Sequence, residues 1–202
     1  MKKAVTLLTI VSLAALTSSC LFRRPPRINL EAMGTIGLVE FQSEAKGNIS
    51  GYATQVFLEV LLKSQPGARI KELGSARDVL GDVGASRLNP AALQALGREH
   101  GVDTIFFGTL DVSKVRPRVD LASIITSLSV SAEVDAIMTS RLVDTRDGTT
   151  LWTDSSRDRQ SVGHVSVFRG GGIFFDARDP EQAYGPLIRH LVLRTTRSFQ
   201  WR

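Results

Sequence analysis

The sequence is poor in the residues that build disulfide frameworks and metal centres. Its 202 residues include one cysteine, Cys20, and three histidines, His100, His164 and His190. A single cysteine forms no disulfide within the chain, and no cysteine cluster is present to hold zinc or an iron–sulfur group. The histidines lie far apart, and none has a second histidine or cysteine three or four residues away. We therefore expect no metal centre and no cofactor.

Long apolar runs are also scarce, and the one that stands out lies at the start of the chain. Met1 to Lys3 is a short cationic start, a mostly apolar stretch of 13 residues follows from Ala4 to Leu16, and small residues lead to Cys20. A helix of this length is too short to cross a bilayer, which takes about 20 residues. The order of these segments is typical of an export signal.

The cysteine that ends this signal resembles the lipobox of bacterial lipoproteins, in which the cysteine becomes the acylated first residue of the mature protein. Thr17 stands where that family usually has leucine, and Leu16 is one place further back. The resemblance implies a signal peptide over residues 1–19 and lipidation of Cys20, with palmitate or a similar chain. Because Leu21 rather than aspartate follows, it also implies an outer-membrane anchor facing the periplasm. The alternative is an ordinary secretory signal cut nearby, with Cys20 left as a free thiol or lost with the signal.

Basic residues are concentrated near the N-terminus. The chain has 25 lysines and arginines against 20 aspartates and glutamates. Two lysines leave with the signal, and Arg23, Arg24 and Arg27 lie just behind Cys20, so the remainder has 20 basic and 20 acidic residues. The folded body is formally neutral, which removes the support for nucleic-acid binding that a basic protein normally has. The three arginines instead fit anionic head groups beside a lipid anchor.

A tether separates this anchor from a single globular domain. Residues 20–34 contain Pro25 and Pro26 and show no apolar periodicity, so we expect no helix there. Fully extended, the segment behind the cysteine spans about 50 Å at most. Residues 35–202 have the length of one domain.

The domain is expected to begin with alternating strands and helices. We expect, in order, a strand over 35–41, an amphipathic helix from Ile49 to Leu61, a short strand over 68–73, a weak helix over 76–83, a helix from Pro90 to Gly101 and a central strand over 102–112. The apolar residues of the first helix recur at i, i+3, i+4 and i+7. Asn89 followed by Pro90 marks a helix start, and a helix between two apolar strands indicates a crossover unit.

The second half is expected to be antiparallel. Apolar residues alternate with polar ones from Val130 to Met138, and Asp147-Gly148 is a strong hairpin signal before a return strand over 149–154. A weaker hairpin joins 162–168 to 173–175 around Gly170 to Gly172. A final helix starts at Asp179-Pro180. One face of that helix is apolar, with Tyr184, Leu187, Ile188, Leu191, Val192 and Thr195.

The order of elements and two local runs resemble a known group of bacterial envelope proteins. The runs are VDTIFFG from Val102 to Gly108 and RLVDTRDGTTLW from Arg141 to Trp152. They are similar to the domain shared by the curli-secretion lipoprotein CsgG, the penicillin-binding-protein activator LpoB and the amino-terminal domain of TolB. The resemblance covers about residues 35 to 158. It implies an α/β (α+β) fold, a mixed sheet flanked by helices, and an envelope role through protein contacts. From the residues themselves, we expect Asp144 and Gly148 to shape the turn, and Leu151 and Trp152 to pack on or brace the sheet.

No motif in the chain demands catalysis. Ser50 stands between Gly47 and Gly51 but does not form a G-x-S-x-G elbow, and Gly170 to Gly172 lacks the lysine of a P-loop. Turn chemistry accounts for Asp144 and Asp147, which leaves Asp154 without a paired carboxylate. We therefore predict a non-enzymatic, membrane-anchored module that binds or assembles an envelope protein, in its sharpest form an activator of peptidoglycan synthesis.

The alternative function is a subunit of a curli-type secretion channel. Such a pore needs membrane strands of about 9 to 11 residues with alternating apolar faces. The best stretch runs from Val119 to Val130, where Ile124 and Ile125 point to opposite faces and serines and threonines interrupt both. A pore predicts a detergent-resistant ring, whereas a binding module predicts a monomer or a small assembly.

Overall fold

The structure, a computed structural model, describes residues 27–45, 48–113, 116–119, 130–162, 165–167, 173–175 and 180–200. The expected signal peptide, Cys20, His164, the loop from Gly170 to Gly172 and residues 120–129 lie outside the described residues.

The observed elements follow the order expected from the sequence, with one strand and two short 3-10 helices added, the first of which lies within the segment 20–34 where no helix was expected. They are η2 (Glu31–Met33), β1 (Thr35–Val39), α2 (Ile49–Ser64), β2 (Arg69–Gly74), α3 (Ala76–Asp82), α4 (Pro90–His100), β3 (Thr104–Val112), β4 (Arg116–Val119), β5 (Val130–Asp144), β6 (Thr150–Val162), β7 (Val165–Val167), β8 (Ile173–Phe175), α5 (Pro180–Thr195) and η4 (Arg197–Phe199). The strand that sequence reasoning missed is β4. Its pairing with β5 forms despite Pro117, because a proline is tolerated where a strand has a free edge.

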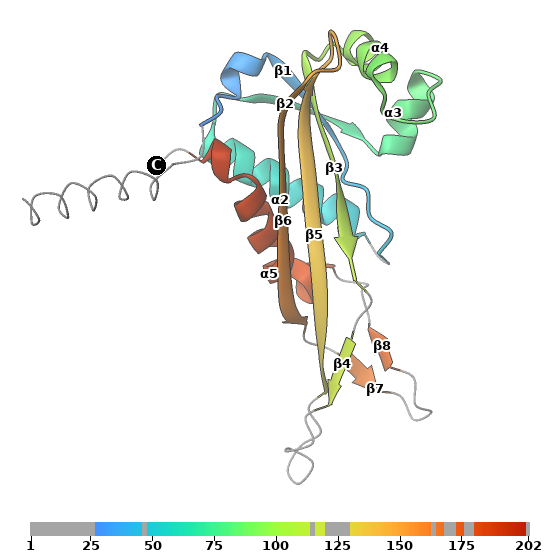
Figure 1. Ribbon diagram of the computed structural model, residues 1–202, viewed down its shortest axis with the longest axis vertical. Helices are drawn as coiled ribbons and strands as arrows, with labels where there is room; N and C mark the ends of the chain where they lie inside the picture. The colour runs from blue at the N-terminus through green and yellow to red at the C-terminus, as the bar shows by residue number, and fades with distance from the viewer. Residues whose placement is uncertain are drawn as a thin grey trace, which may run out of the picture.

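The main sheet is mixed, as predicted (Figure 1). Along its hydrogen-bonded neighbours the strand order is β2-β1-β3-β5-β4. Strands β3 and β4 pair with successive parts of one edge of β5, residues 136–144 and 130–133, and β6 pairs with the opposite edge. Strand β1 is parallel to both β2 and β3, whereas β3, β5 and β6 are antiparallel. The parallel part comes from the crossover units, and the antiparallel β5–β6 pair comes from the hairpin at Gly148, whose φ of +78° suits a glycine.

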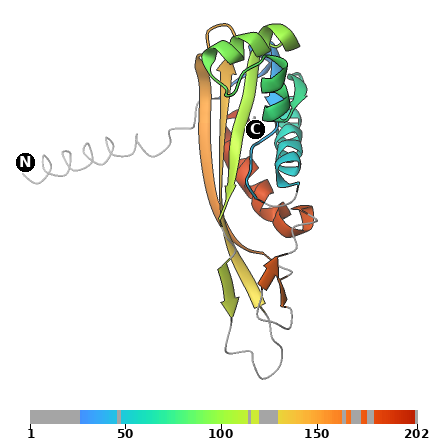
Figure 2. The ribbon, with the colours of Figure 1, turned by 90° about the vertical axis from the view of Figure 1, so that its right-hand side faces the viewer.

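Helices cover the two faces of this sheet unequally. Helices α2 and α5 pack on one face, while α3 and α4 lie on the other face near β1 and β3 (Figures 1 and 2). The described part of the chain places no helix over the lower half of β5 and β6 on the α3/α4 side.

An aromatic cluster forms the centre of the core between the sheet and helices α2 and α5. Phe106 of β3 lies with its ring centroid 5.4 Å from that of Phe57, 6.0 Å from that of Trp152 and 5.7 Å from that of Phe199. Phe41 extends the cluster beyond Phe57 at 5.0 Å. These five rings come from the segment after β1, from α2 and η4, and from strands β3 and β6. The cluster therefore joins segments from both ends of the domain.

One glycine makes this core possible. A Cβ atom on Gly108 would collide with the carbonyl oxygen of Thr139 and would lie 2.6 Å from the ring of Phe41. Strand β3 therefore needs glycine at this position to stay paired with β5 while Phe41 packs across it. The glycine that the resemblance placed on the central strand has a packing role.

Helix α5 uses the apolar face that its sequence predicts. The six residues of that face are buried: Tyr184, Leu187, Ile188, Leu191, Val192 and Thr195. Ser156 of β6 donates a hydrogen bond to the Leu191 carbonyl oxygen at 2.9 Å, and its hydroxyl lies 2.6 Å from that of Thr195. The helix is thus joined to strand β6 by polar contacts as well as by apolar packing. Within the described residues, no helix is long and apolar enough to cross a membrane.

The folded contacts begin earlier than the expected domain start at Thr35. Leu30 is fully buried, and its backbone N–H donates to the side chain of Gln65 at 2.7 Å. The Gln65 amide donates to the carbonyl oxygens of Ile28 at 2.7 Å and Phe199 at 2.9 Å, and the Ile28 N–H donates to the Ser198 carbonyl oxygen at 3.1 Å. We call these five residues the tether junction. Folded contacts thus reach back to Ile28, within the segment 20–34 that was expected to form the tether.

Candidate binding cleft

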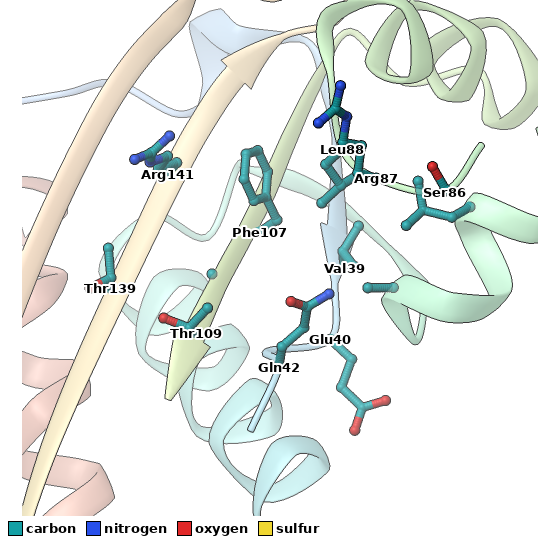
Figure 3. Close-up of a pocket in the computed structure, with 13 residues that line it drawn as sticks. Val39, Glu40, Gln42, Ser86, Arg87, Leu88, Phe107, Thr109, Thr139 and Arg141 are labelled. Carbon is teal, nitrogen blue, oxygen red and sulfur yellow. The ribbon is translucent and has the colours of Figure 1, made fainter. Parts of the chain in front are cut away.

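A cleft of about 440 Å³ lies where the helices leave the sheet uncovered (Figure 3). The sheet forms its floor, and α3 with the segment that follows it forms one wall. The floor residues are Val39, Glu40, Gln42, Phe107, Gly108, Thr109, Thr139 and Arg141, and the wall residues are Ala76, Leu80, Ser86, Arg87 and Leu88. The cleft lies beyond the carboxyl end of β1, the edge at which open α/β sheets bind ligands.

Strand alternation and register set the floor. Phe107 and Thr109 lie on the opposite face of β3 from Phe106, and antiparallel pairing places Arg141 opposite Phe107 and Thr139 opposite Thr109. The ring of Phe107 is half-buried, and the Thr139 hydroxyl lies 3.1 Å from the hydroxyl of Ser155 on β6. The floor is an aromatic ring bordered by a guanidinium group and hydroxyl groups.

The wall is held in place by a helix cap and a second apolar core. The Ser75 hydroxyl accepts a hydrogen bond from the Asp78 N–H at 3.3 Å and caps α3. The apolar residues that pack α3 and α4 on the sheet are Val39, Ala76, Val79, Leu93, Leu96, Val102, Ile105 and Val143. This packing holds Leu88 and Arg87 beside the floor (Figure 3).

The charged groups of the cleft are available to a ligand. Arg87 and Arg141 are exposed, and neither guanidinium group has an ion pair within the part of the chain that the structure describes. Glu40 contributes a carboxylate at the mouth. In Figure 3, Phe107 lies between Arg141 on one side and Leu88 and Arg87 on the other. Among the described residues, no histidine, cysteine or lysine lines the cleft. The lining offers an apolar surface flanked by donors for carboxylate groups.

The residues that the sequence marked at the hairpin have structural roles. Asp144 accepts hydrogen bonds from the backbone N–H of Arg146 at 2.8 Å and from its guanidinium Nε at 3.0 Å. Asp147 accepts from the Thr149 N–H at 2.8 Å. Both carboxylates thus stabilise the turn around Gly148, as predicted. The hydrogen bond from the Arg146 side chain lowers the pKa of Asp144 below its usual value, with a smaller opposing effect from burial.

This pKa shift predicts the pH dependence of a variant. Since the pKa of Asp144 is lower in the folded protein than in the unfolded chain, its carboxylate stabilises the fold above about pH 4 and loses that contribution as the pH falls through the folded pKa. Asp144→Asn is expected to lower the free energy of unfolding at pH 7, and the difference from wild type is expected to shrink on acidification. Urea unfolding at a series of pH values measures it. A difference that stays constant with pH would contradict the assignment.

The other sequence-selected residues do not gather at one site. His100 ends α4 with its Nε2 3.5 Å from Asp82, and His190 is exposed on α5 with its Nδ1 3.1 Å from Asp158. Asp154 accepts a hydrogen bond from its neighbour Ser155. No group of three or more metal-ligating side chains occurs among the described residues. Trp152 is buried and donates to the Ser198 hydroxyl at 2.9 Å, in agreement with its expected structural role. Leu151, for which packing was also expected, is 41% exposed, because adjacent residues of a strand point to opposite faces.

Sequence reasoning missed the cleft itself. Phe107 was assigned only to a central strand, and Arg87 lies in a segment between two helices for which no role was expected. The alternation of Phe106 and Phe107 was a usable signal, since one of two adjacent rings on a strand must face away from the other. The proximity of Phe107 to Arg141 depends on the register of two strands separated by residues 113–129.

Comparison with known proteins gives similarity in structure only. No protein-family model and no curated protein matches the chain. Among solved structures, a PelC dodecamer from Paraburkholderia phytofirmans matches with a TM-score of 0.46 and 12% identity, over 89% of this chain and 95% of that one. Lipoprotein GNA1162 from Neisseria meningitidis matches with a TM-score of 0.40 and 16% identity, over 63% and 83%.

The LpoB C-terminal domain from Salmonella enterica also matches, with a TM-score of 0.40 and 10% identity, over 63% of this chain and 84% of that one. LpoB, one of the proteins that the sequence resembles, is thus among the similar solved structures, whereas the grouping with CsgG and TolB stays a prediction. The chain is similar to lipoproteins and to an LpoB domain at a level that assigns it to no family.

Proposed function

We propose that this protein is a lipoprotein of the outer membrane, anchored through Cys20, that acts without catalysis as a periplasmic protein-binding or assembly module. The signal sequence and its terminal cysteine support the anchor. The cleft supports the binding role. Its described lining offers an aromatic ring and two guanidinium groups and has no nucleophile paired with a base.

The observation that carries the proposal is the position of Phe107 between two arginines that lack ion pairs in the described chain. Aromatic residues and arginine are enriched among the residues that dominate the energy of protein interfaces. A segment with an apolar side chain next to a carboxylate fits this lining. The apolar group covers Phe107 and Leu88, and the carboxylate accepts hydrogen bonds from Arg87 or Arg141.

The sharper form of the proposal is an activator of peptidoglycan synthesis with a penicillin-binding protein as its partner, as the sequence resemblance implies. The tether limits the geometry of such a complex. From Cys20 to Ile28 the chain spans about 29 Å at most, at 3.6 Å per residue. A partner anchored in the inner membrane must therefore extend outward to reach the cleft.

Charge reversal in the cleft tests the proposal. Arg87→Glu with Arg141→Glu is expected to weaken binding to a purified penicillin-binding protein by about 30-fold or more, because the loss of one interface arginine of this kind costs about 2 kcal/mol or more. Arg157→Glu is the matched control, an exposed arginine on the same face of the sheet but outside the cleft. Biolayer interferometry measures both. Equal affinity for the double variant and wild type would remove the cleft from the interface.

The second candidate function is a subunit of a secretion channel, and one observation favours it. Strand β4 pairs with β5 from Arg116–Glu133 to Val119–Val130, so residues 120–129 connect two antiparallel strands, where the sequence marked a membrane hairpin. The described length of β4 is four residues, well below the 9 to 11 of a membrane strand. Light scattering on the detergent-extracted lipoprotein separates the two functions. A large ring identifies a channel, and a monomer or dimer excludes it.

A further inference from the structure

We propose that the surface around the tether junction binds the anionic head groups of the membrane in which the protein is anchored. The residues of this junction patch are Arg27, Lys63, Arg69, Arg194 and Arg197. The inference rests on the proposed function for its setting, since a lipid anchor at Cys20 is what brings the patch to a membrane. The binding itself is a property of the folded domain and is measurable without the lipid.

The charge of the patch contrasts with the rest of the domain. Within four residues of any tether-junction residue along the chain, the described part has five basic side chains and one acidic side chain, Glu31. The sequence after the tether arginines is formally neutral, with equal numbers of basic and acidic residues. The positive charge is therefore concentrated at one end of a formally neutral body, the end that is joined to the segment containing Cys20.

Most of these cations are free to meet an external anion. Arg27, Arg69 and Arg197 are exposed and have no carboxylate partner among the described residues. Lys63 lies 3.5 Å from Glu59, in a pair whose side chains are 75% and 42% exposed and which is therefore weak. Arg194 donates to the carbonyl oxygen of Arg157 at 3.2 Å, a bond that leaves its charge uncompensated.

The tether holds the patch close to the lipid surface. Cys20 and Arg27 are seven residues apart, which is about 25 Å at full extension and less for a relaxed chain. The junction hydrogen bonds of Gln65 and Ile28 fix the point of departure beside α2 and η4. The Debye length is about 8 Å at physiological ionic strength, so a patch on this short tether repeatedly enters the range of the surface charge.

Contact through the patch gives the domain an orientation. Four of the patch residues lie on α2, α5 and η4 or just before η2, whereas Arg69 begins the edge strand β2. Strand alternation places Arg69 on the α3/α4 face, since Ile70 packs toward α2 and Lys71 donates to the His100 carbonyl oxygen of α4. The patch therefore follows the end of the domain that is joined to the tether, and contact through it turns that end toward the bilayer.

A vesicle-binding assay on the full mature chain with Cys20→Ser tests this inference without the lipid anchor. The vesicles contain phosphatidylethanolamine with phosphatidylglycerol, and phosphatidylcholine replaces phosphatidylglycerol in the neutral control. Lys63 and Arg194 lie in the last turns of α2 and α5, where a positive charge also stabilises the helix, so their replacement would change stability as well as charge. The test therefore uses Arg69 and Arg197. Arg69→Gln with Arg197→Gln is expected to weaken binding to the anionic vesicles by about 25-fold, at about 5-fold for each charge. High salt is expected to release the parent chain.

The matched control is Arg77→Gln with Arg157→Gln, which removes two exposed arginines, one on α3 and one on β6. It is expected to bind the anionic vesicles like the parent chain. Equal binding by the Arg69/Arg197 variant and the parent would overturn the inference, because the tether arginines would then account for all of it. Equal weakening in both double variants would also overturn it, since net charge rather than the patch would be responsible. Neither result bears on acylation of Cys20, which membrane fractionation tests separately.

Discussion

Truncation of Phe106 to alanine is expected to lower the free energy of unfolding by about 3 to 5 kcal/mol, the usual range for a buried phenylalanine in a core. The ring is fully buried and contacts Phe57, Trp152 and Phe199 with centroids 5.4 to 6.0 Å away. Its loss removes apolar burial and three edge-to-face contacts and leaves a cavity between the sheet, α2 and η4. Since domains of this size are stable by about 5 to 15 kcal/mol, the variant is expected to be close to unfolding.

The neighbouring ring provides the control for this prediction. Phe107 lies on the opposite face of β3 and is half-buried in the cleft, so Phe107→Ala is expected to cost about 1 kcal/mol, half or less of a full transfer free energy. Urea unfolding of the lipid-free mature chain measures both variants through the shift in midpoint at constant slope. Equal losses for the two variants would show that the faces of β3 are wrongly assigned.

Replacement of Cys20 by alanine is expected to move the protein from the membrane fraction to the soluble periplasmic fraction. Each methylene group of a buried acyl chain contributes about 0.8 kcal/mol, so a lipidated cysteine with several chains makes the anchor effectively permanent. The variant keeps the export signal and the entire folded body. Cell fractionation after a high-salt wash, followed by immunoblotting, measures the change, and incorporation of labelled palmitate reports acylation directly.

A conservative variant at the signal controls for changes in export. Thr17→Leu brings the sequence before Cys20 closer to the lipobox that it resembles and is expected to leave the protein in the membrane fraction. If Cys20→Ala also stays there after the wash, the anchor is not at this cysteine. The salt wash matters because the junction patch alone is expected to give reversible, salt-sensitive membrane association.

Local patterns in the sequence predicted the elements that have one apolar face. The buried face of α5 was predicted residue by residue from the spacing of Tyr184 to Thr195, and the turn at Gly148 from its aspartate-glycine pair. In both, the responsible contacts are periodic or lie within a few residues. The burial of Leu30 was not predictable in this way, because its partner Gln65 lies 35 residues away.

The missed features depend on contacts between distant segments. Strand β6 continues to Val162 rather than ending near Asp154, because the backbone of β5 supplies pairing along a stretch whose polar side chains predict no strand. The cleft requires the register that sets Phe107 opposite Arg141, and the packing that brings Arg87 to the sheet. Sequence periodicity contains neither of these.

The central claim is that the cleft is where a protein partner binds in the envelope, and site-specific photocrosslinking in cells tests it most directly. A photoreactive residue at Thr139 lies in the cleft floor, and one at the exposed Arg189 of α5 lies on the other face of the sheet. The account predicts a discrete adduct with an envelope protein from Thr139, which Arg141→Glu abolishes, and none from Arg189. An adduct from Arg189 alone, or one from Thr139 that persists with Arg141→Glu, would contradict it.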